Sequence, residues 1–136
     1  MKTLSSGQIY DGGLNNFNSV AYLDDNSRLI LTFEGVIRVD NPSRYLSSYL
    51  DELTRVLPQY PITSTLIEFT KLRFCNSNGF YVIMDIINAV YDLVPGPVTV
   101  KRLINDDWQQ ETLPILLNLQ EDDIATRTTL EDVQPA

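Results

Sequence analysis

Short apolar runs along the chain predict its strands. Two runs rich in β-forming residues, 20–23 and 28–37, are separated by Asp24-Asp25-Asn26-Ser27, four turn-forming residues that suit a hairpin. Two later runs, 64–69 and 98–103, combine apolar and β-branched residues and also predict strands.

Apolar residues that recur at three- and four-residue steps predict three helices. The first is expected to begin with Asn41 as its cap and Pro42 at the first helical position, and to end before Pro58. The second, over 80–91, is apolar over so wide an arc that we expect it to pack between a sheet and another element. The third is expected over 108–119.

Capping residues and one proline define this third helix. Asp106 or Asp107 is expected to cap it, with Gln109 or Gln110 in the reciprocal capping position. Pro114 must kink the helix or divide it into two short pieces.

The alternating order of strands and helices predicts an α/β fold, with one mixed sheet of four or five strands and helices packed against it. Residues 1–18 hold three of the six glycines and few apolar residues, so we expect a flexible N-terminal arm or at most a weak edge hairpin. A single domain is expected over 19–133, followed by a short tail at 134–136. Within that domain, 124–129 could add an edge strand, and Thr129 could cap a last short turn.

Composition and charge then exclude several classes of function. The 136 residues contain no histidine and one cysteine, which removes histidine-dependent catalytic relays and disfavours zinc, and we therefore expect no enzyme and no cofactor. The formal net charge of -8 predicts repulsion from nucleic acid and from anionic membranes. Because no run reaches the ~18 apolar residues of a spanning helix, we expect a cytoplasmic protein.

One segment carries candidate chemistry, where the strand at 64–69 leads through a polar loop into the helix at 80–91. Ser77 lies where the first backbone N–H groups of that helix have no intrahelical partner, so its oxygen is expected to cap the helix. Gly79 leaves the backbone open to close approach. A phosphate on Ser77 would add roughly -1.5 to -2 charge at a helix N-terminus, where anions are favoured. These properties suit a switch.

The segment resembles the signature of STAS domains, typified by bacterial anti-sigma-factor antagonists. In that family a strand ends near an Asp-Ser-Ser-Gly-Leu-like element that opens a helix, and Asn76-Ser77-Asn78-Gly79-Phe80 occupies the same place here. The likeness extends in order and spacing from about Ser19 to Val133. Among STAS-like proteins, the pattern most resembles a divergent set that is associated with cyanobacterial signalling operons.

The resemblance implies a STAS-like signalling protein and names its site. Ser77 matches the phosphoacceptor, with Asn76, Asn78, Gly79 and Phe80 as partner-binding residues. The implied partners are a serine kinase of the histidine-kinase-like ATPase type, or an anti-sigma-type regulator, and a PP2C-type phosphatase. The chain departs from the pattern at Asn76, where the family has an acid, and at Asn78, where it has a second serine. Losing that acid changes kinase selection or abolishes phosphorylation, so a protein-binding or assembly module that is never phosphorylated stands as the alternative.

Other candidate residues have two readings each. Cys75 is either a redox sensor at a helix N-terminus or a small buried hydrophobe. Asp106, Asp107 and Glu111 could hold Mg²⁺ or take part in acid–base chemistry, and a capped helix with a solvated acidic face explains them equally well. Trp108, the only tryptophan, either anchors a partner or packs across the start of a helix.

Charged and aromatic residues near the motif are also open to two interpretations. Lys71 and Arg73 either pair with acids of a partner or solvate the loop. Tyr45 and Tyr49, at helical spacing, are expected to pack in the core rather than bind a ligand.

Overall fold

The base of the molecule is a six-stranded sheet. This computed structural model describes residues 1–135. Its strands are β1 (Lys2–Asp11), β2 (Leu14–Leu23), β3 (Arg28–Ile37), β4 (Ser64–Cys75), β5 (Val98–Leu103) and β6 (Thr128–Val133). They lie in sequence order; β1, β2 and β3 pair antiparallel, and β3 to β6 pair parallel.

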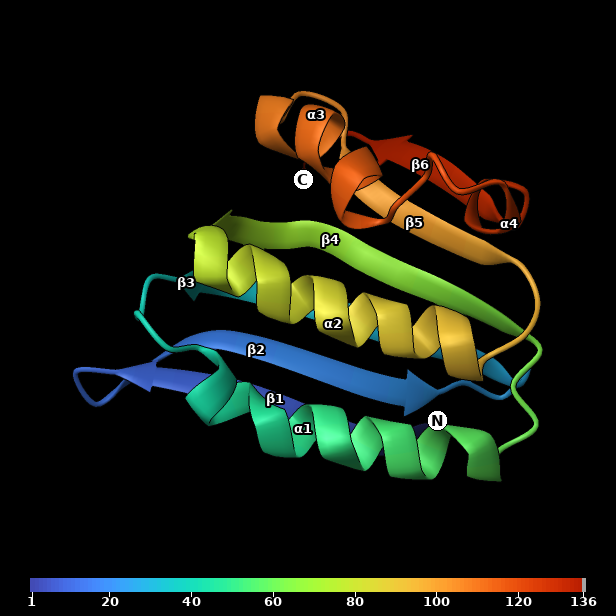
Figure 1. The fold of residues 1–136 in the computed structure, drawn as a ribbon, viewed down its shortest axis with the longest axis horizontal. Coiled ribbons are helices and arrows are strands. Elements are labelled where there is room, and N and C mark those ends of the chain that lie inside the picture. Colours follow the sequence, from blue (N-terminus) through green and yellow to red (C-terminus); the bar gives the residue numbers. More distant parts are fainter. Residues whose placement is uncertain (136) are drawn as a thin grey trace.

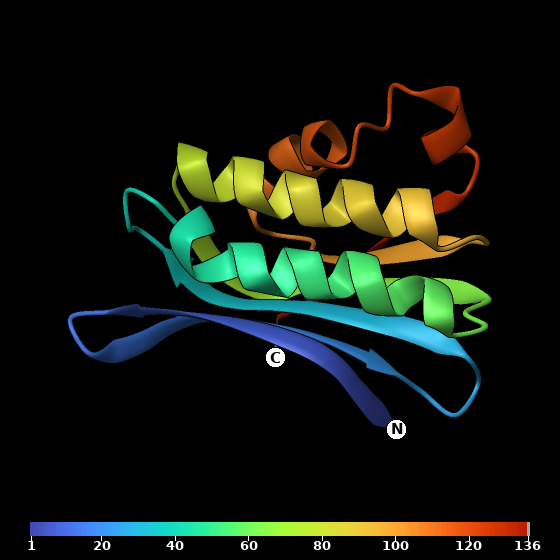
Figure 2. The ribbon, with the colours of Figure 1, turned by 60° about the horizontal axis from the view of Figure 1, so that its bottom comes forward.

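Helices cover one face of this sheet (Figures 1 and 2). They are α1 (Ser43–Val56), the short 3-10 turn η1 (Leu57–Gln59), α2 (Ser77–Leu93), α3 (Asp107–Leu116) and α4 (Asp122–Ala125). Crossovers between parallel strands are right-handed, and the parallel strands advance in one direction across the sheet, so every crossover helix falls on the same side.

The core lies between the sheet and the helices. Three fully buried rings, Phe17, Phe33 and Phe69, stack from β2 through β3 to β4 with centroid distances of 6.4 and 5.1 Å. Helix α1 packs against the edge strand β1, where a Cβ on Gly7 would lie 2.7 Å from the Tyr49 ring. The Tyr49 hydroxyl is hydrogen-bonded to the buried Ser19 at 2.8 Å, so the expectation that Tyr49 is a core residue is confirmed; Tyr45 is 38% exposed instead.

The predicted α/β class is confirmed, with one or two more strands than expected. The extra strand comes from residues 1–18. The expectation that these residues form a flexible arm is wrong. Residues 2–11 form β1 and pair with β2 through a Gly12-Gly13 turn, which is the edge hairpin that the sequence allows as its alternative. Residues 2–11, which lie outside the expected domain 19–133, are therefore part of the sheet. Of the expected tail 134–136, Ala136 lies outside the described residues.

Local boundaries differ in three further places. Pro42, and not Asn41, is the N-cap residue of α1, and no side chain caps that helix. Strand β4 continues six residues beyond Phe69. The strand expected at 124–129 is wrong, because residues 122–125 form α4 and the last strand starts at Thr128, so Thr129 lies in β6 and caps no turn.

Candidate functional site at the start of α2

Helix α2 begins directly after β4, at the candidate motif. Asn76 is its N-cap: the side-chain Oδ1 accepts the Gly79 N–H at 2.8 Å, and the Asn76 carbonyl accepts the Phe80 N–H at 2.9 Å. The prediction that Ser77 caps the helix is therefore wrong. Ser77 is the first helical residue, is exposed, and takes no part in the cap.

Two asparagine amides join this turn to the connection between β3 and α1. Asn76 Nδ2 donates to the carbonyl of Val39 at 3.0 Å, and Asn78 Nδ2 donates to the carbonyl of Asp40 at 2.7 Å. These are the two positions at which the chain departs from the family pattern. An amide can donate such bonds, whereas the ionised acid that the family has at the first position only accepts.

Gly79 allows the first turn of α2 to approach the sheet. A Cβ at this position would lie 2.8 Å from Ile37 Cγ2 and 3.1 Å from the Cβ of Cys75. Gly79 is buried, as are both of these neighbours. The glycine thus fixes how closely the helix start sits against the ends of β3 and β4.

Two shallow, open depressions flank the exposed ring of Tyr81, which lines both. The first measures about 190 Å³ and holds Ser77; its other lining residues are Cys75, Asn76, Phe80, Tyr81 and Trp108. The second, about 360 Å³, lies between the β3–α1 connection and α2, and Asp40, Asn78 and Asp85 are among its lining residues. The first depression has no ionisable acid or base other than the Cys75 thiol and the Tyr81 phenol, whereas the second has two carboxylates.

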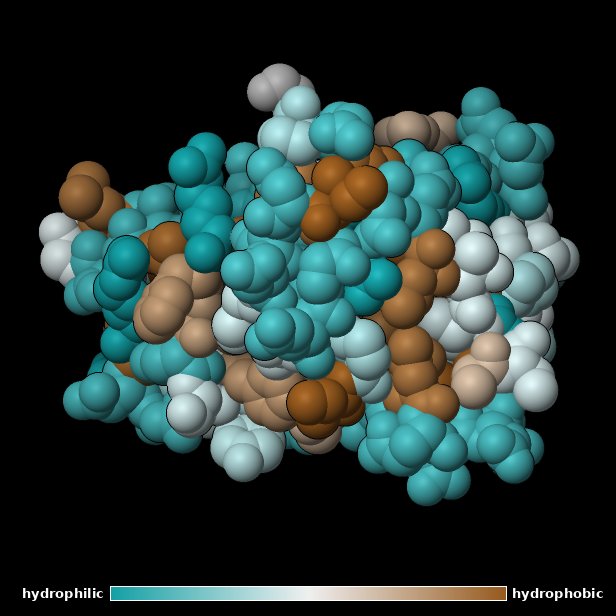
Figure 3. Space-filling model, turned by 90° about the horizontal axis from the view of Figure 1, so that it is seen from above, coloured by the Kyte–Doolittle hydropathy of each residue, from teal (hydrophilic) through white to brown (hydrophobic). Residues whose placement is uncertain are grey.

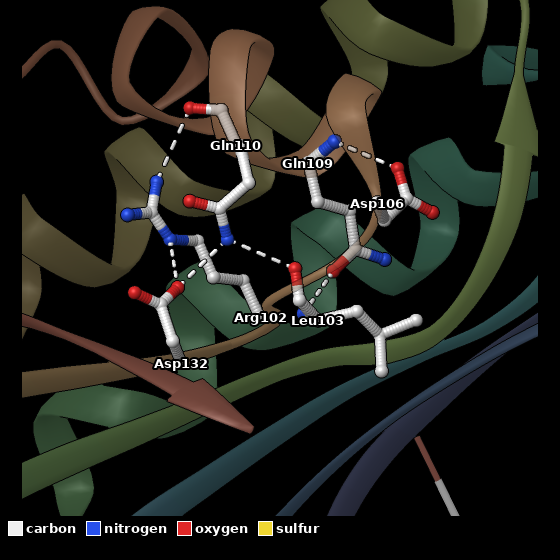
Figure 4. A network of polar contacts seen from close by, with 6 residues as sticks. All are labelled: Arg102, Leu103, Asp106, Gln109, Gln110 and Asp132. Carbon is white, nitrogen blue, oxygen red and sulfur yellow. Dashed lines mark hydrogen bonds and ion pairs between the residues drawn. The ribbon is translucent and has the colours of Figure 1, made fainter. Parts of the chain in front are cut away.

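Trp108 reaches the Ser77 depression from α3, which a polar network holds to the sheet (Figure 4). Asp106 Oδ1 accepts the Gln109 N–H at 2.9 Å, so Asp106 caps α3 as predicted. The reciprocal capping role predicted for Gln109 or Gln110 is wrong. Both side chains bond instead to β5, where Gln109 Oε1 accepts the Leu103 N–H at 2.7 Å and Gln110 Nε2 donates to the Leu103 carbonyl at 2.9 Å.

Gln109 also bonds to β4. It is fully buried, and its Nε2 donates to the carbonyls of Phe69 at 2.9 Å and Leu72 at 3.2 Å. Strands β4 and β5 pair only over residues 65–68 of β4, and Figure 1 shows them diverging beyond that point. One side chain, next in sequence to Trp108, therefore takes the place of the missing strand pairing.

Cys75 is a buried thiol. Burial raises the pKa of its thiol to about 11, so at neutral pH the group is protonated rather than a reactive thiolate. The structure favours the buried hydrophobe over the redox sensor, because desolvation by burial sets this pKa.

The remaining sequence candidates do not line the Ser77 depression. Lys71 and Arg73 line a groove at the end of β4 that shares no residue with the Ser77 depression. Within residues 1–135 no three His, Cys, Asp or Glu side chains are grouped so that they could hold a metal ion, and Asp106, Asp107 and Glu111 are no exception. In the same range no helix is long and apolar enough to cross a membrane.

The exposed hydrophobic residues include several near this end of the molecule. Tyr81 is 59% exposed, and Phe74, stacked under the Arg38 guanidinium at 5.1 Å, is 46% exposed. Viewed over α3 and β6, hydrophilic side chains cover most of the surface and hydrophobic ones lie in separate patches (Figure 3).

Sequence reasoning missed two contributors to the site. The β3–α1 connection at Val39 and Asp40 carries no motif, and its only signal is the pair of amides that replace an acid and a serine. Gln109 was expected to act within its own helix, and only the structure shows that it is buried and bonds to β4 and β5.

Comparison with known proteins supports the fold. No family model and no curated protein matches the sequence. Among solved structures, the unphosphorylated form of the anti-sigma factor antagonist SpoIIAA matches with a TM-score of 0.52 at 10% sequence identity, over 85% of this chain and 89% of that one. The chain therefore has a STAS-like fold, as the motif predicted.

Proposed function

We propose that this protein is a STAS-like regulator that binds a partner protein through the start of α2 and is switched by phosphorylation of Ser77. The observation that carries the proposal is the position of Ser77. It is the exposed first residue of α2, and Asn76 rather than Ser77 supplies the cap. A kinase can therefore modify the hydroxyl without removing the hydrogen bond that starts the helix.

A phosphate at this position is compatible with the fold. The first N–H groups of a helix lack intrahelical partners, and the Asn76 side chain uses only that of Gly79. The N–H groups of Ser77 and Asn78 lie at the positive end of the helix dipole, where an anion gains about 0.3 to 1 kcal/mol. Phosphorylation then changes the surface while the core stays as it is.

The same phosphate would strongly alter what can bind. The Ser77 depression is lined by a thiol, an amide and three aromatic rings. Adding roughly -1.5 to -2 charge there converts a neutral, partly aromatic surface into an anionic one. A partner whose apolar or neutral groups fit the hydroxyl form would have to desolvate that charge without pairing it, which weakens the complex.

The proposed partners follow from the family resemblance. They are a cytoplasmic serine kinase of the histidine-kinase-like ATPase type, or an anti-sigma-type regulator, together with a PP2C-type phosphatase that restores the hydroxyl. The structural neighbour is itself an anti-sigma factor antagonist, which supports a regulatory rather than an enzymatic role for this chain.

Mass spectrometry of the protein purified from its own host tests the proposal. We expect a population heavier by about 80 Da, one phosphoryl group, with the group located on Ser77. Ser77→Ala should lack that population, and Ser48→Ala, which changes an exposed serine of α1, should keep it. A phosphate that persists in Ser77→Ala, or a wild-type protein with none, would leave the unphosphorylated binding module as the better account.

A further inference from the structure

Asn76, Asn78 and the β3–α1 connection form a small structural unit around Ser77. The two side-chain amides donate to consecutive carbonyls, those of Val39 and Asp40, at 3.0 and 2.7 Å. The two residues lie 37 and 38 positions away in sequence from those carbonyls. Ser77 is the single residue between the two donors, so the candidate phosphoacceptor lies at the centre of this cross-link.

Other bonds hold each side of the cross-link. The Asn76 backbone N–H donates to the Ile37 carbonyl at 3.0 Å, where β3 ends. On the opposite side, the Arg44 N–H donates to the Asn41 carbonyl at 3.2 Å, where α1 begins. Between these points, residues 38–41 belong to no helix or regular strand. The hydrogen bonds donated by the side-chain amides of Asn76 and Asn78 connect them to the start of α2.

The surface formed in this way is continuous with the Ser77 depression. Tyr81 lines both the depression that contains Ser77 and the one between the β3–α1 connection and α2. Asn78 lines the second depression while its amide holds Asp40. A protein large enough to place a catalytic group at Ser77 must therefore also cover the connection.

We propose that Asn76 and Asn78 are positioning residues of the switch, which hold residues 39–41 against the start of α2 so that the kinase that modifies Ser77 meets one preformed surface. This inference rests on the proposed function of Ser77. The two asparagines supply amide donors where the family pattern has an acid and a serine. Residues 39 and 40 are thus held by the side chains on either side of Ser77.

Two variants separate this positioning role from the helix cap. Asn78→Ala removes an exposed donor and leaves the cap intact. Asn76→Asp keeps an oxygen that accepts the Gly79 N–H, and it places a carboxylate against the Val39 carbonyl in place of the donor. Asn88→Ala is the matched control, because Asn88 is also an exposed asparagine of α2 and lies three turns further along the helix.

Hydrogen exchange measured by NMR on the isolated protein gives the first readout. In Asn78→Ala and Asn76→Asp the amides of residues 44 and 76, once corrected for the intrinsic rate of each sequence, should exchange about fivefold faster, the factor that loss of one hydrogen bond of ordinary net strength produces in an equilibrium. Asn88→Ala should leave both rates unchanged. Equal exchange in all three variants would overturn the inference whatever the fate of Ser77.

Occupancy of phosphate on Ser77 in the host gives the second readout. Asn78→Ala should lower it about fivefold relative to wild type and Asn88→Ala, and Asn78→Gln, which keeps an amide donor, should restore part of it. If exchange accelerates but the occupancy stays at the wild-type level, the positioning role is refuted and the proposed function stands. If the wild-type protein carries no phosphate on Ser77, the proposed function fails, and the positioning role fails with it.

Discussion

The substitution Gln109→Ala tests whether this buried side chain holds β4 and β5 in place. The Gln109 side chain makes two buried hydrogen bonds, to the carbonyls of Phe69 and Leu72, and accepts one partly buried hydrogen bond from the Leu103 N–H. Leaving a buried polar group unpaired costs about 1 to 3 kcal/mol. A carbonyl keeps a second lone pair, so we place the two buried bonds near the low end of that range and expect a total loss of about 3 to 5 kcal/mol.

The neighbouring glutamine provides the matched control. Gln110 lies next in sequence and bonds to the Leu103 carbonyl and to the exposed Asp132 carboxylate, but it is only partly buried. Water can replace its bonds after Gln110→Ala, so we expect a loss of about 1 kcal/mol. Gln109→Met keeps the approximate volume of the side chain and removes its bonds, and this variant separates the hydrogen bonds from the cavity.

Urea unfolding followed by Trp108 fluorescence measures these differences, because the only tryptophan lies on α3 next to Gln109. A domain of ordinary stability has about 5 to 15 kcal/mol in total, so Gln109→Ala should shift the midpoint strongly. Gln109→Met should lose nearly as much free energy of unfolding as Gln109→Ala. If Gln109→Ala costs no more than Gln110→Ala, the bonds of this side chain do not hold β4 and β5 in place.

Three further predictions concern single sites. Burial raises the pKa of the Cys75 thiol to about 11 from 9.0, so the contribution of this thiol to stability should be complete below pH 9.0 and decline as pH rises towards 11. A thiol reagent at pH 8 should label Cys75 far faster in urea than in the native state, and equal labelling rates would refute its burial. The Gln110 amide, and after it Arg102, lowers the pKa of Asp132. The stability that the ionised Asp132 contributes is therefore present above the ordinary carboxyl pKa and is lost as pH falls through the lowered one. Gln110→Ala should raise the pKa of Asp132 in a carboxyl NMR titration, and an unchanged value would count against the hydrogen bond between Gln110 and Asp132. Gly79→Ala should lose up to about 2 kcal/mol in urea unfolding, because overpacking costs about 1 to 3 kcal/mol and the gain in helix propensity offsets about 1. A more stable variant would contradict the contact with Ile37.

The fold class was predictable because most elements carry their own periodicity. Strand β3 and the helices α1 and α2 bury a regular set of apolar residues, and their positions follow from the spacing alone. Strand β1 lacks that signal. Its inward positions include Ser5 and Gly7, and a small residue is required at Gly7 because the Tyr49 ring lies against the strand.

The location of the candidate site was predictable, but its internal arrangement was not. Serine and asparagine are equally good caps, and adjacent residues of both types leave the choice to tertiary contacts. Asn76 also donates to Val39, a residue 37 positions away, and no local pattern records that bond. The approach of Trp108 to Ser77 depends in the same way on Gln109 joining α3 to β4.

The most direct test of the account compares two forms of the same protein that differ only at Ser77. One is immobilised with serine at this position, and the other with phosphoserine incorporated during synthesis. We expect the cognate partner from the host to bind the serine form and to be recovered in far smaller amounts with the phosphoserine form. Equal recovery of that partner with both forms would contradict the central claim that a charge at the start of α2 switches binding.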